Sequence, residues 1–90
     1  MTVPLPLGRV VATPGALKLL LEAGAHPFDY LARHATGDWG DLCGFDRRQN
    51  EIALRGGLRV FSSYAVPAGK VWIITEADRS ITTILLPEEY

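Results

Sequence analysis

The chain has 90 residues, of which 48% are hydrophobic and 21% are charged, and its formal net charge at pH 7 is −1. This length predicts a single domain over residues 1–90, and this composition is typical of a globular protein and excludes a disordered one. Proteins that bind nucleic acid through bulk charge carry a clear basic excess, so the near-zero net charge argues against that class.

The sequence also predicts a cytoplasmic protein that uses neither a metal nor another cofactor. Cys43 is the single cysteine, so no intramolecular disulfide can form. The two histidines and this cysteine do not have the spacing of zinc ligands, and no phosphate-binding or dinucleotide-binding glycine motif is present. No segment approaches the roughly 18–20 apolar residues of a membrane span, so no membrane partner is expected. Residues 1–9 lack the basic start and apolar core of a signal peptide.

The chain is expected to begin with an extended arm and a short helix. Residues 1–12 carry two prolines and a short apolar stretch, which favour an arm that adds an edge strand. A helix is predicted next, because Thr13 suits the N-cap, Pro14 the first helical position and Gly24 the C-terminal cap.

Two more helical segments are predicted before the pattern changes. One covers residues 26–37, with a proline near its start and Gly37 at its end. The other would begin at Asp41, an N-cap candidate, and end at the pair Gly56-Gly57.

After this glycine pair, the hydrophobic period becomes that of strands. Three segments rich in β-branched and aromatic residues cover residues 58–66, 70–76 and 80–87. Helices followed by an antiparallel meander predict the α+β class. We expect two or three helices within residues 13–56, packed on one face of a three- or four-stranded antiparallel sheet whose meander covers residues 58–87.

The lengths of the two hairpin loops decide which strand residues face the helices. With three residues in each loop, 67–69 and 77–79, alternation would turn one apolar set toward the helices: Phe61, Ala65, Val71, Ile73, Ile81 and Leu85. The opposite face would mix aromatic, hydroxyl and carboxyl groups: Val60, Ser62, Tyr64, Trp72, Ile74, Glu76, Ser80, Thr82 and Ile84. A second loop of four residues would replace Ser80 and Thr82 on that face with Ile81 and Thr83.

Glu76 and Arg79 stand at the second hairpin turn and form the first candidate site. A carboxylate can act as a general base, and an arginine can hold an anion such as a phosphate. A solvated turn, in which Asp78 and Arg79 merely supply polarity, explains the same residues.

A second candidate cluster contains Arg33, His34, Asp38 and Trp39. Histidine exchanges protons near neutral pH, and Asp38 could orient the imidazole. The structural alternative places His34 at the border of the second helix and Trp39 in the gap between helices. Two glycines bracket Trp39 in "GDWGD", which favours a shaped loop.

Ser62, Tyr64, Trp72 and Thr82 are binding candidates on the mixed face. Tyr64 and Trp72 would be cross-strand neighbours, and an exposed aromatic pair can stack on nucleic-acid bases. Ordinary cross-strand packing explains the pair equally well.

Four segments resemble a group of small proteins from bacterial mobile elements: "RVVATPGAL", "RHATGDWGDL", "SSYAV" and "WIITEADRSITTILLPEEY". Sequences of this group are often labelled plasmid-related proteins or type I restriction enzyme M subunits. The methyltransferase label does not fit, because such a subunit needs a doubly wound sheet and an (N/D)PP(Y/F) motif that this chain lacks.

The expected arrangement of helices and sheet is also similar to the barnase–EndoU–colicin–RelE class of small ribonucleases. This likeness implies metal-independent RNA cleavage with Glu76 as general base, His34 as general acid and Arg79 as the cation that stabilises the phosphorane.

Two functions follow as hypotheses. The first is a metal-independent ribonuclease or toxin-like enzyme that acts on RNA. The second is a non-enzymatic accessory or inhibitor protein of the anti-defence type, which binds a host or defence protein.

Overall fold

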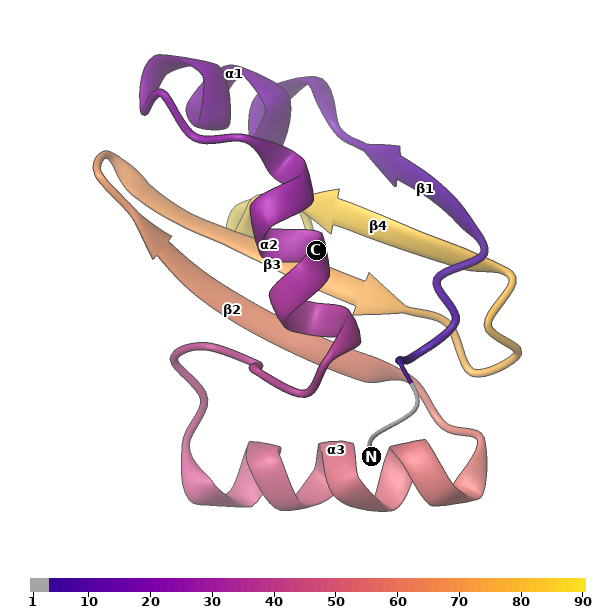
Figure 1. The fold of residues 1–90 in the computed structure, drawn as a ribbon. Coiled ribbons are helices and arrows are strands. Elements are labelled where there is room, and N and C mark those ends of the chain that lie inside the picture. The colour runs from indigo at the N-terminus through magenta and orange to yellow at the C-terminus, as the bar shows by residue number, and fades with distance from the viewer. Residues whose placement is uncertain (1–3) are drawn as a thin grey trace.

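The protein is built on a twisted sheet that carries α1 and α2 on one of its faces, with α3 beside the strand β2 (Figure 1). The computed structural model describes residues 4–90, and within them the chain forms a sheet of four strands, three α-helices and one short 3-10 helix. In chain order the elements are β1 (Arg9–Ala12), α1 (Pro14–Glu22), α2 (Pro27–Ala35), α3 (Gly44–Gly56), β2 (Val60–Val66), β3 (Gly69–Thr75), β4 (Ile81–Leu85) and η1 (Pro87–Glu89). The α+β prediction is confirmed.

The sheet is mixed, which corrects the expectation of a wholly antiparallel one. The strand order is β1-β4-β3-β2, and β1 runs parallel to β4. The meander β2-β3-β4 is antiparallel as predicted. The helices separate β1 from the meander in the sequence, so the arm can join the far edge of the sheet in the direction of β4.

Local sequence signals explain where α1 and α2 begin. Thr13 Oγ1 accepts a hydrogen bond from the Ala16 N–H at 3.1 Å, and Pro14 follows at the first helical position. The ring of His26 caps α2 in the same way by accepting from the Phe28 N–H at 3.2 Å.

The helix α3 begins at Gly44, three residues after the predicted start. The Asp41 N–H donates to the Ser63 carbonyl at 2.7 Å, so Asp41 joins the edge of β2 and is not an N-cap. Gly40 forms a parallel bridge to Ser63 with a φ of 73°, and Trp39 is buried against α3. The "GDWGD" segment is therefore a shaped loop fastened to β2.

The first hairpin has a two-residue turn, Pro67-Ala68, because Val66 pairs with Gly69. One residue fewer in the loop turns every side chain of β2 to the other face of the sheet. Phe61 and Ala65 therefore point away from the helices, contrary to expectation, whereas Val60, Ser62 and Tyr64 point toward them.

The second hairpin has the four-residue loop that the sequence offered as the alternative. Thr75 pairs with Thr82, and the Glu76 N–H donates to the Ile81 carbonyl at 3.0 Å. Thr82 and Ile84 consequently face the helices, and Ile81 and Leu85 do not. The orientation of β3 agrees with the expectation. Val71 and Ile73 face the helices, and Trp72 and Ile74 face away from them.

Two faces of the sheet are thus defined by the register. The helix face carries Val60, Ser62, Tyr64, Val66, Val71, Ile73, Thr75, Thr82 and Ile84. The outward face carries Phe61, Ser63, Ala65, Lys70, Trp72, Ile74, Ile81, Thr83 and Leu85. The main core lies between the helix face and α1 and α2, where Ala16, Leu20 and Leu31 contact the strands.

Candidate functional site

His34, the predicted general acid, lies at the centre of the core. Its exposed fraction is 0%, and both ring nitrogens are hydrogen-bonded, Nδ1 to Ser62 and Nε2 to Thr75 at 2.8 Å. Thr75 continues to Thr82 at 2.8 Å, and the Thr82 hydroxyl donates to the Leu7 carbonyl at 2.7 Å. This buried chain of hydrogen bonds connects α2, three strands and the N-terminal arm.

The direction of each hydrogen bond in this chain follows from its last member. Since the Thr82 proton goes to the Leu7 carbonyl, Thr75 must donate to Thr82 and accept from His34 Nε2. His34 Nδ1 then accepts from the Ser62 hydroxyl. The imidazole is therefore the neutral Nε2–H tautomer. Burial lowers the pKa of His34 to about 4, which keeps the ring neutral at physiological pH.

Lowering the pH is expected to destabilise the protein through His34. The His34 imidazole binds a proton near pH 6.5 in the unfolded chain but only near pH 4 in the folded protein. The free energy of unfolding therefore decreases as the pH falls from 6.5 to 4. The full loss, reached below pH 4, is about 3 kcal/mol from the size of the pKa difference, and about 2 kcal/mol of it is lost between pH 7 and pH 4.5. Urea unfolding at pH 7 and at pH 4.5 measures it.

The variant His34→Gln provides the control, because an amide keeps hydrogen-bonding groups at this position but does not titrate. Protonation of carboxylates changes the stability of both proteins equally between pH 7 and pH 4.5. Only the wild type also protonates His34, so it should lose more stability than the variant. Equal losses in the two proteins would show that His34 does not carry the effect.

Glu76, the predicted base, lies on the other side of the sheet from His34. Its Oε1 accepts from Arg59 Nε at 3.3 Å and from Arg59 Nη2 at 3.1 Å. The structure therefore does not bring His34 and Glu76 into one cleft. A proton donor and acceptor must come within hydrogen-bond reach of the same substrate, which this placement does not provide.

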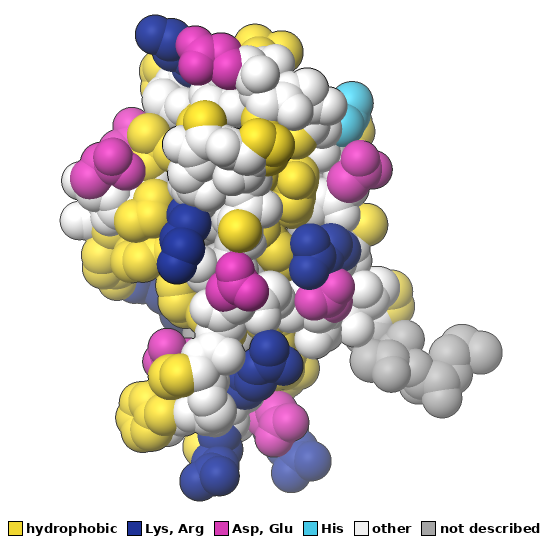
Figure 2. Space-filling model, turned by 90° about the vertical axis from the view of Figure 1, so that its left-hand side faces the viewer, with side chains coloured by type: hydrophobic (Ala, Val, Ile, Leu, Met, Phe, Trp, Pro, Cys, Tyr) yellow, Lys and Arg dark blue, Asp and Glu magenta, His cyan; other side chains and the backbone are white. Residues whose placement is uncertain are grey.

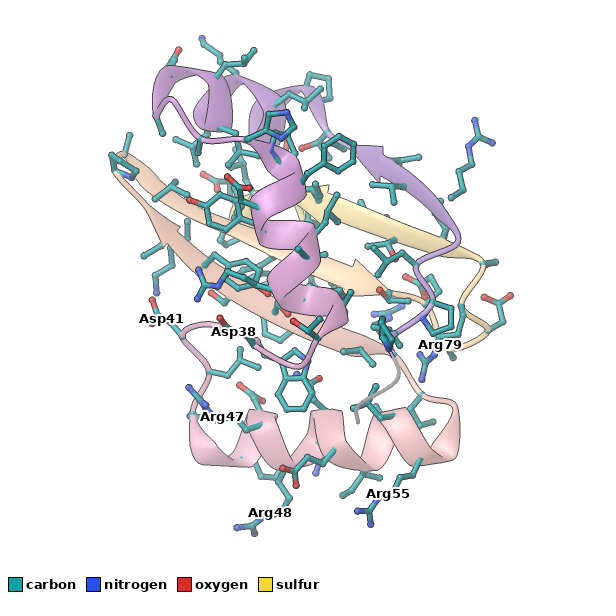
Figure 3. All side chains as sticks on the ribbon, in the orientation of Figure 1. Asp38, Asp41, Arg47, Arg48, Arg55 and Arg79 are labelled. Carbon is teal, nitrogen blue, oxygen red and sulfur yellow. The ribbon has the colours of Figure 1, made fainter. Side chains whose placement is uncertain are left out.

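Arg79, the predicted anion ligand, donates its hydrogen bonds to backbone carbonyls of its own chain. Its guanidinium donates to the carbonyls of Leu58, of Glu76 at 3.2 Å and of Ala53 at 2.9 Å. Figure 3 shows Arg79 between the β3–β4 turn and the C-terminal end of α3. Carbonyls near the end of a helix are favourable partners for a cation. Arg79 thus joins the second hairpin to α3.

Arg33 and Asp38 form a surface ion pair beside the helix face. Arg33 Nε lies 2.7 Å from Asp38 Oδ2, and this hydrogen bond lowers the pKa of Asp38. Arg33 also lies over the Tyr64 ring at 4.7 Å, and the Tyr64 hydroxyl donates to the Asp38 carbonyl at 2.6 Å. Asp38 therefore orients Arg33 and not His34. The cluster fastens the loop after α2 to the sheet.

Three of the predicted binding residues are not available to a ligand. Ser62, Tyr64 and Thr82 are 0%, 1% and 0% exposed, because the hairpin registers turn them toward the helices. Burial raises the pKa of Tyr64 to about 12. Trp39 is also in the core, where it packs with Leu42 and neighbouring apolar residues.

Trp72 is the predicted binding residue that lies on the outward face. Its ring meets Phe61 edge-on at 4.9 Å and Tyr90 at 5.8 Å between centroids. With Arg59 and Ile74, these three aromatic residues line a shallow hollow of about 280 Å³. Figure 2 shows hydrophobic side chains gathered along its left side, which is the rear of the view in Figure 1. We call Arg59, Phe61, Trp72, Ile74 and Tyr90 the aromatic groove.

Charges of both signs surround the aromatic groove. Arg59 bridges Glu76 and the Tyr90 hydroxyl, to which it donates at 2.8 Å. A second shallow hollow continues along Phe61 and Trp72, and its polar lining comprises Asp41, Asp46, Ser63 and Lys70. The groove therefore has an aromatic centre and a border that carries charges of both signs.

The arginines that cluster in the sequence do not form one basic surface. Figure 3 shows Arg48 and Arg55 on the side of α3 that points away from the sheet, and Arg47 beside the loop before α3. Arg47 donates to the carbonyls of Leu42 and Gly40, both at 3.0 Å. Among residues 4–90, no group of three His, Cys, Asp or Glu side chains is placed to hold a metal ion.

Sequence reasoning missed Arg59, Phe61 and Tyr90 as groove residues. Phe61 would have been found by giving the first hairpin a two-residue turn, since alternation then places it beside Trp72. Tyr90 reaches the groove because η1 turns the chain back over the sheet. No local pattern in the sequence predicts the contact between Tyr90 and Trp72.

No family model matches this chain, and the comparisons with curated proteins and with solved structures gave no match either. In the described part of the chain, no helix has both the length and the apolar character needed to cross a membrane. The geometry of the aromatic groove is therefore the basis for the functional proposal.

Proposed function

We propose that this chain is a non-enzymatic binding protein that engages a partner protein through the aromatic groove. The observation that carries the proposal is an aromatic and apolar centre on the sheet face opposite α1 and α2, bordered by charges of both signs. Tryptophan, tyrosine and arginine are the residues that contribute most often to protein-binding energy. The proposed partner is a host or defence protein.

The charges around the groove favour a protein over RNA. A single-stranded nucleic acid needs aromatic stacking together with cations that follow its backbone. Here Arg59 is already paired with Glu76, and Asp41 and Asp46 border the adjacent hollow that Lys70 also lines. A mixed border of this kind complements the polar rim of a protein interface.

A capture experiment with matched variants tests the proposal. Tyr90 and Phe28 are each 70% exposed, but Tyr90 lies in the groove and Phe28 on α2. From a bacterial host lysate, the wild type and Phe28→Ala should retain one stoichiometric protein. Tyr90→Ala should lose it, with a decrease in affinity of tenfold or more expected for an interface hot spot.

An RNA assay on the same proteins separates this proposal from the ribonuclease hypothesis. RNA incubated with the wild type in EDTA is expected to remain intact. Cleavage that Glu76→Gln abolishes without unfolding the protein would overturn the proposal, as would a partner that Tyr90→Ala retains fully.

A further inference from the structure

The outer edge of β1 carries backbone groups that point away from the sheet. The Arg9 N–H donates to the Ser80 carbonyl at 3.0 Å and the Thr13 N–H to the Ile84 carbonyl at 2.9 Å. Alternation along the strand then turns the N–H and C=O groups of Val10 and Ala12 outward. Within residues 4–90, no strand lies beyond β1, and Val10 is 42% exposed.

The opposite edge of the sheet is covered. The Asn50 side chain donates to the Phe61 carbonyl at 2.6 Å and accepts from its N–H at 3.0 Å. At Ser63, the carbonyl accepts from the Asp41 N–H and the N–H donates to the Trp39 carbonyl at 3.1 Å. Proteins commonly block edge strands in this way, because an uncovered edge pairs with another chain. The contrast makes β1 the edge at which pairing can occur.

We propose that β1 pairs with β1 of a second copy in antiparallel orientation, with the two-fold axis at Val11. Each Val10 then exchanges both backbone hydrogen bonds with Ala12 of the other copy, and the two sheets become continuous. In the same register, Arg9 lies opposite Thr13 of the second copy, on the same face of the sheet.

Charge complementarity supports the second copy as the occupant. The Thr13 hydroxyl donates to Glu89 Oε1 at 2.6 Å, so the position opposite Arg9 holds a carboxylate. The Leu86 N–H donates to the same oxygen at 2.8 Å, and these bonds lower the pKa of Glu89. Among residues 4–90, Arg9 has no acidic partner within its own chain. The dimer supplies that partner twice, once from each copy.

Four of the five groove residues lie on or beside β2 and β3, which β4 separates from the paired edge, so the dimer contact does not use the strands of the groove; the fifth, Tyr90, directly follows Glu89. The inference therefore stands independently of the proposed function. It also places two grooves on one continuous sheet, an arrangement that strengthens binding to a partner with repeated sites.

Disulfide trapping tests the register. Side chains of a non-hydrogen-bonded antiparallel pair lie about 4.5–5.5 Å apart at Cβ, close enough for a disulfide after small adjustment. In a Cys43→Ser background, Val11→Cys should form a linked dimer in air, whereas Val10→Cys, one residue away, should not. Equal trapping by both variants, or none by Val11→Cys, overturns the register.

Sedimentation of the charge variants tests the occupant. The wild type should show a concentration-dependent dimer, and Arg9→Glu and Glu89→Arg should each weaken it by at least about tenfold through like-charge contacts. Mixing the two variants should restore the dimer, because each copy then offers the charge that the other needs. A wild type that stays monomeric at all concentrations, or a mixture that stays monomeric, overturns the inference.

Discussion

Replacing His34 with alanine is expected to lower the free energy of unfolding by about 3–5 kcal/mol, because the change leaves a cavity and removes one hydrogen-bond partner from each of two buried hydroxyls. Those hydroxyls belong to Ser62 and Thr75, and both residues are 0% exposed. Domains of this size are stable by only about 5–15 kcal/mol, so a large part of the stability would be lost. Urea denaturation at pH 7, followed by tryptophan fluorescence, measures the change.

His26→Ala is the matched control for this prediction. His26 caps α2 from the surface through one hydrogen bond to the Phe28 N–H, so its loss should cost about 1 kcal/mol. A His34→Ala variant that is no less stable than His26→Ala would show that the buried chain of hydrogen bonds does not support the fold.

Gly40→Ala is expected to destabilise the protein by about 3 kcal/mol or more, through a backbone clash added to conformational strain. A methyl group at this position would strike the Ser63 carbonyl oxygen and would lie 2.7 Å from Tyr64 Cδ1. The bridge from Gly40 to Ser63 holds the loop after α2 against β2, so relief of the clash must separate these segments.

Gly37→Ala separates the clash from the strain, because Gly37 also has a positive φ, of 91°, but its added methyl group would meet nothing within 4 Å. The left-handed conformation alone costs an alanine about 1–2 kcal/mol. Thermal or urea unfolding should therefore show that Gly40→Ala is much less stable than Gly37→Ala. Equal stabilities would mean that the loop does not depend on the close approach to Ser63.

The sequence predicted the elements well because their signals are local. Thr13 and Pro14 mark the start of α1, and strand-like composition marks the meander, without reference to the rest of the chain. The parallel pairing of β1 could not be predicted in this way. It depends on where the arm lies after the helices have packed, which is a property of the whole fold.

The candidate site was harder to predict because it depends on hairpin register. Pro67-Ala68 lacks the Asn-Gly type of signal that announces a two-residue turn, so the length of the first loop was uncertain by one residue. That single residue decides whether Tyr64 or Phe61 lies beside Trp72 on the outward face. His34 illustrates a second limit, since a sequence does not distinguish a histidine buried between hydroxyls from one that faces a substrate.

Photo-crosslinking from the aromatic groove tests the central claim most directly. Benzoylphenylalanine would replace Tyr90 in the groove or, as the control, Phe28 on α2, two positions with the same exposure. In a host lysate, the probe at position 90 should link the chain to one protein, and the probe at position 28 should not. Equal crosslinking from both positions, or none from position 90 while a partner still co-purifies, would contradict a binding function for this groove.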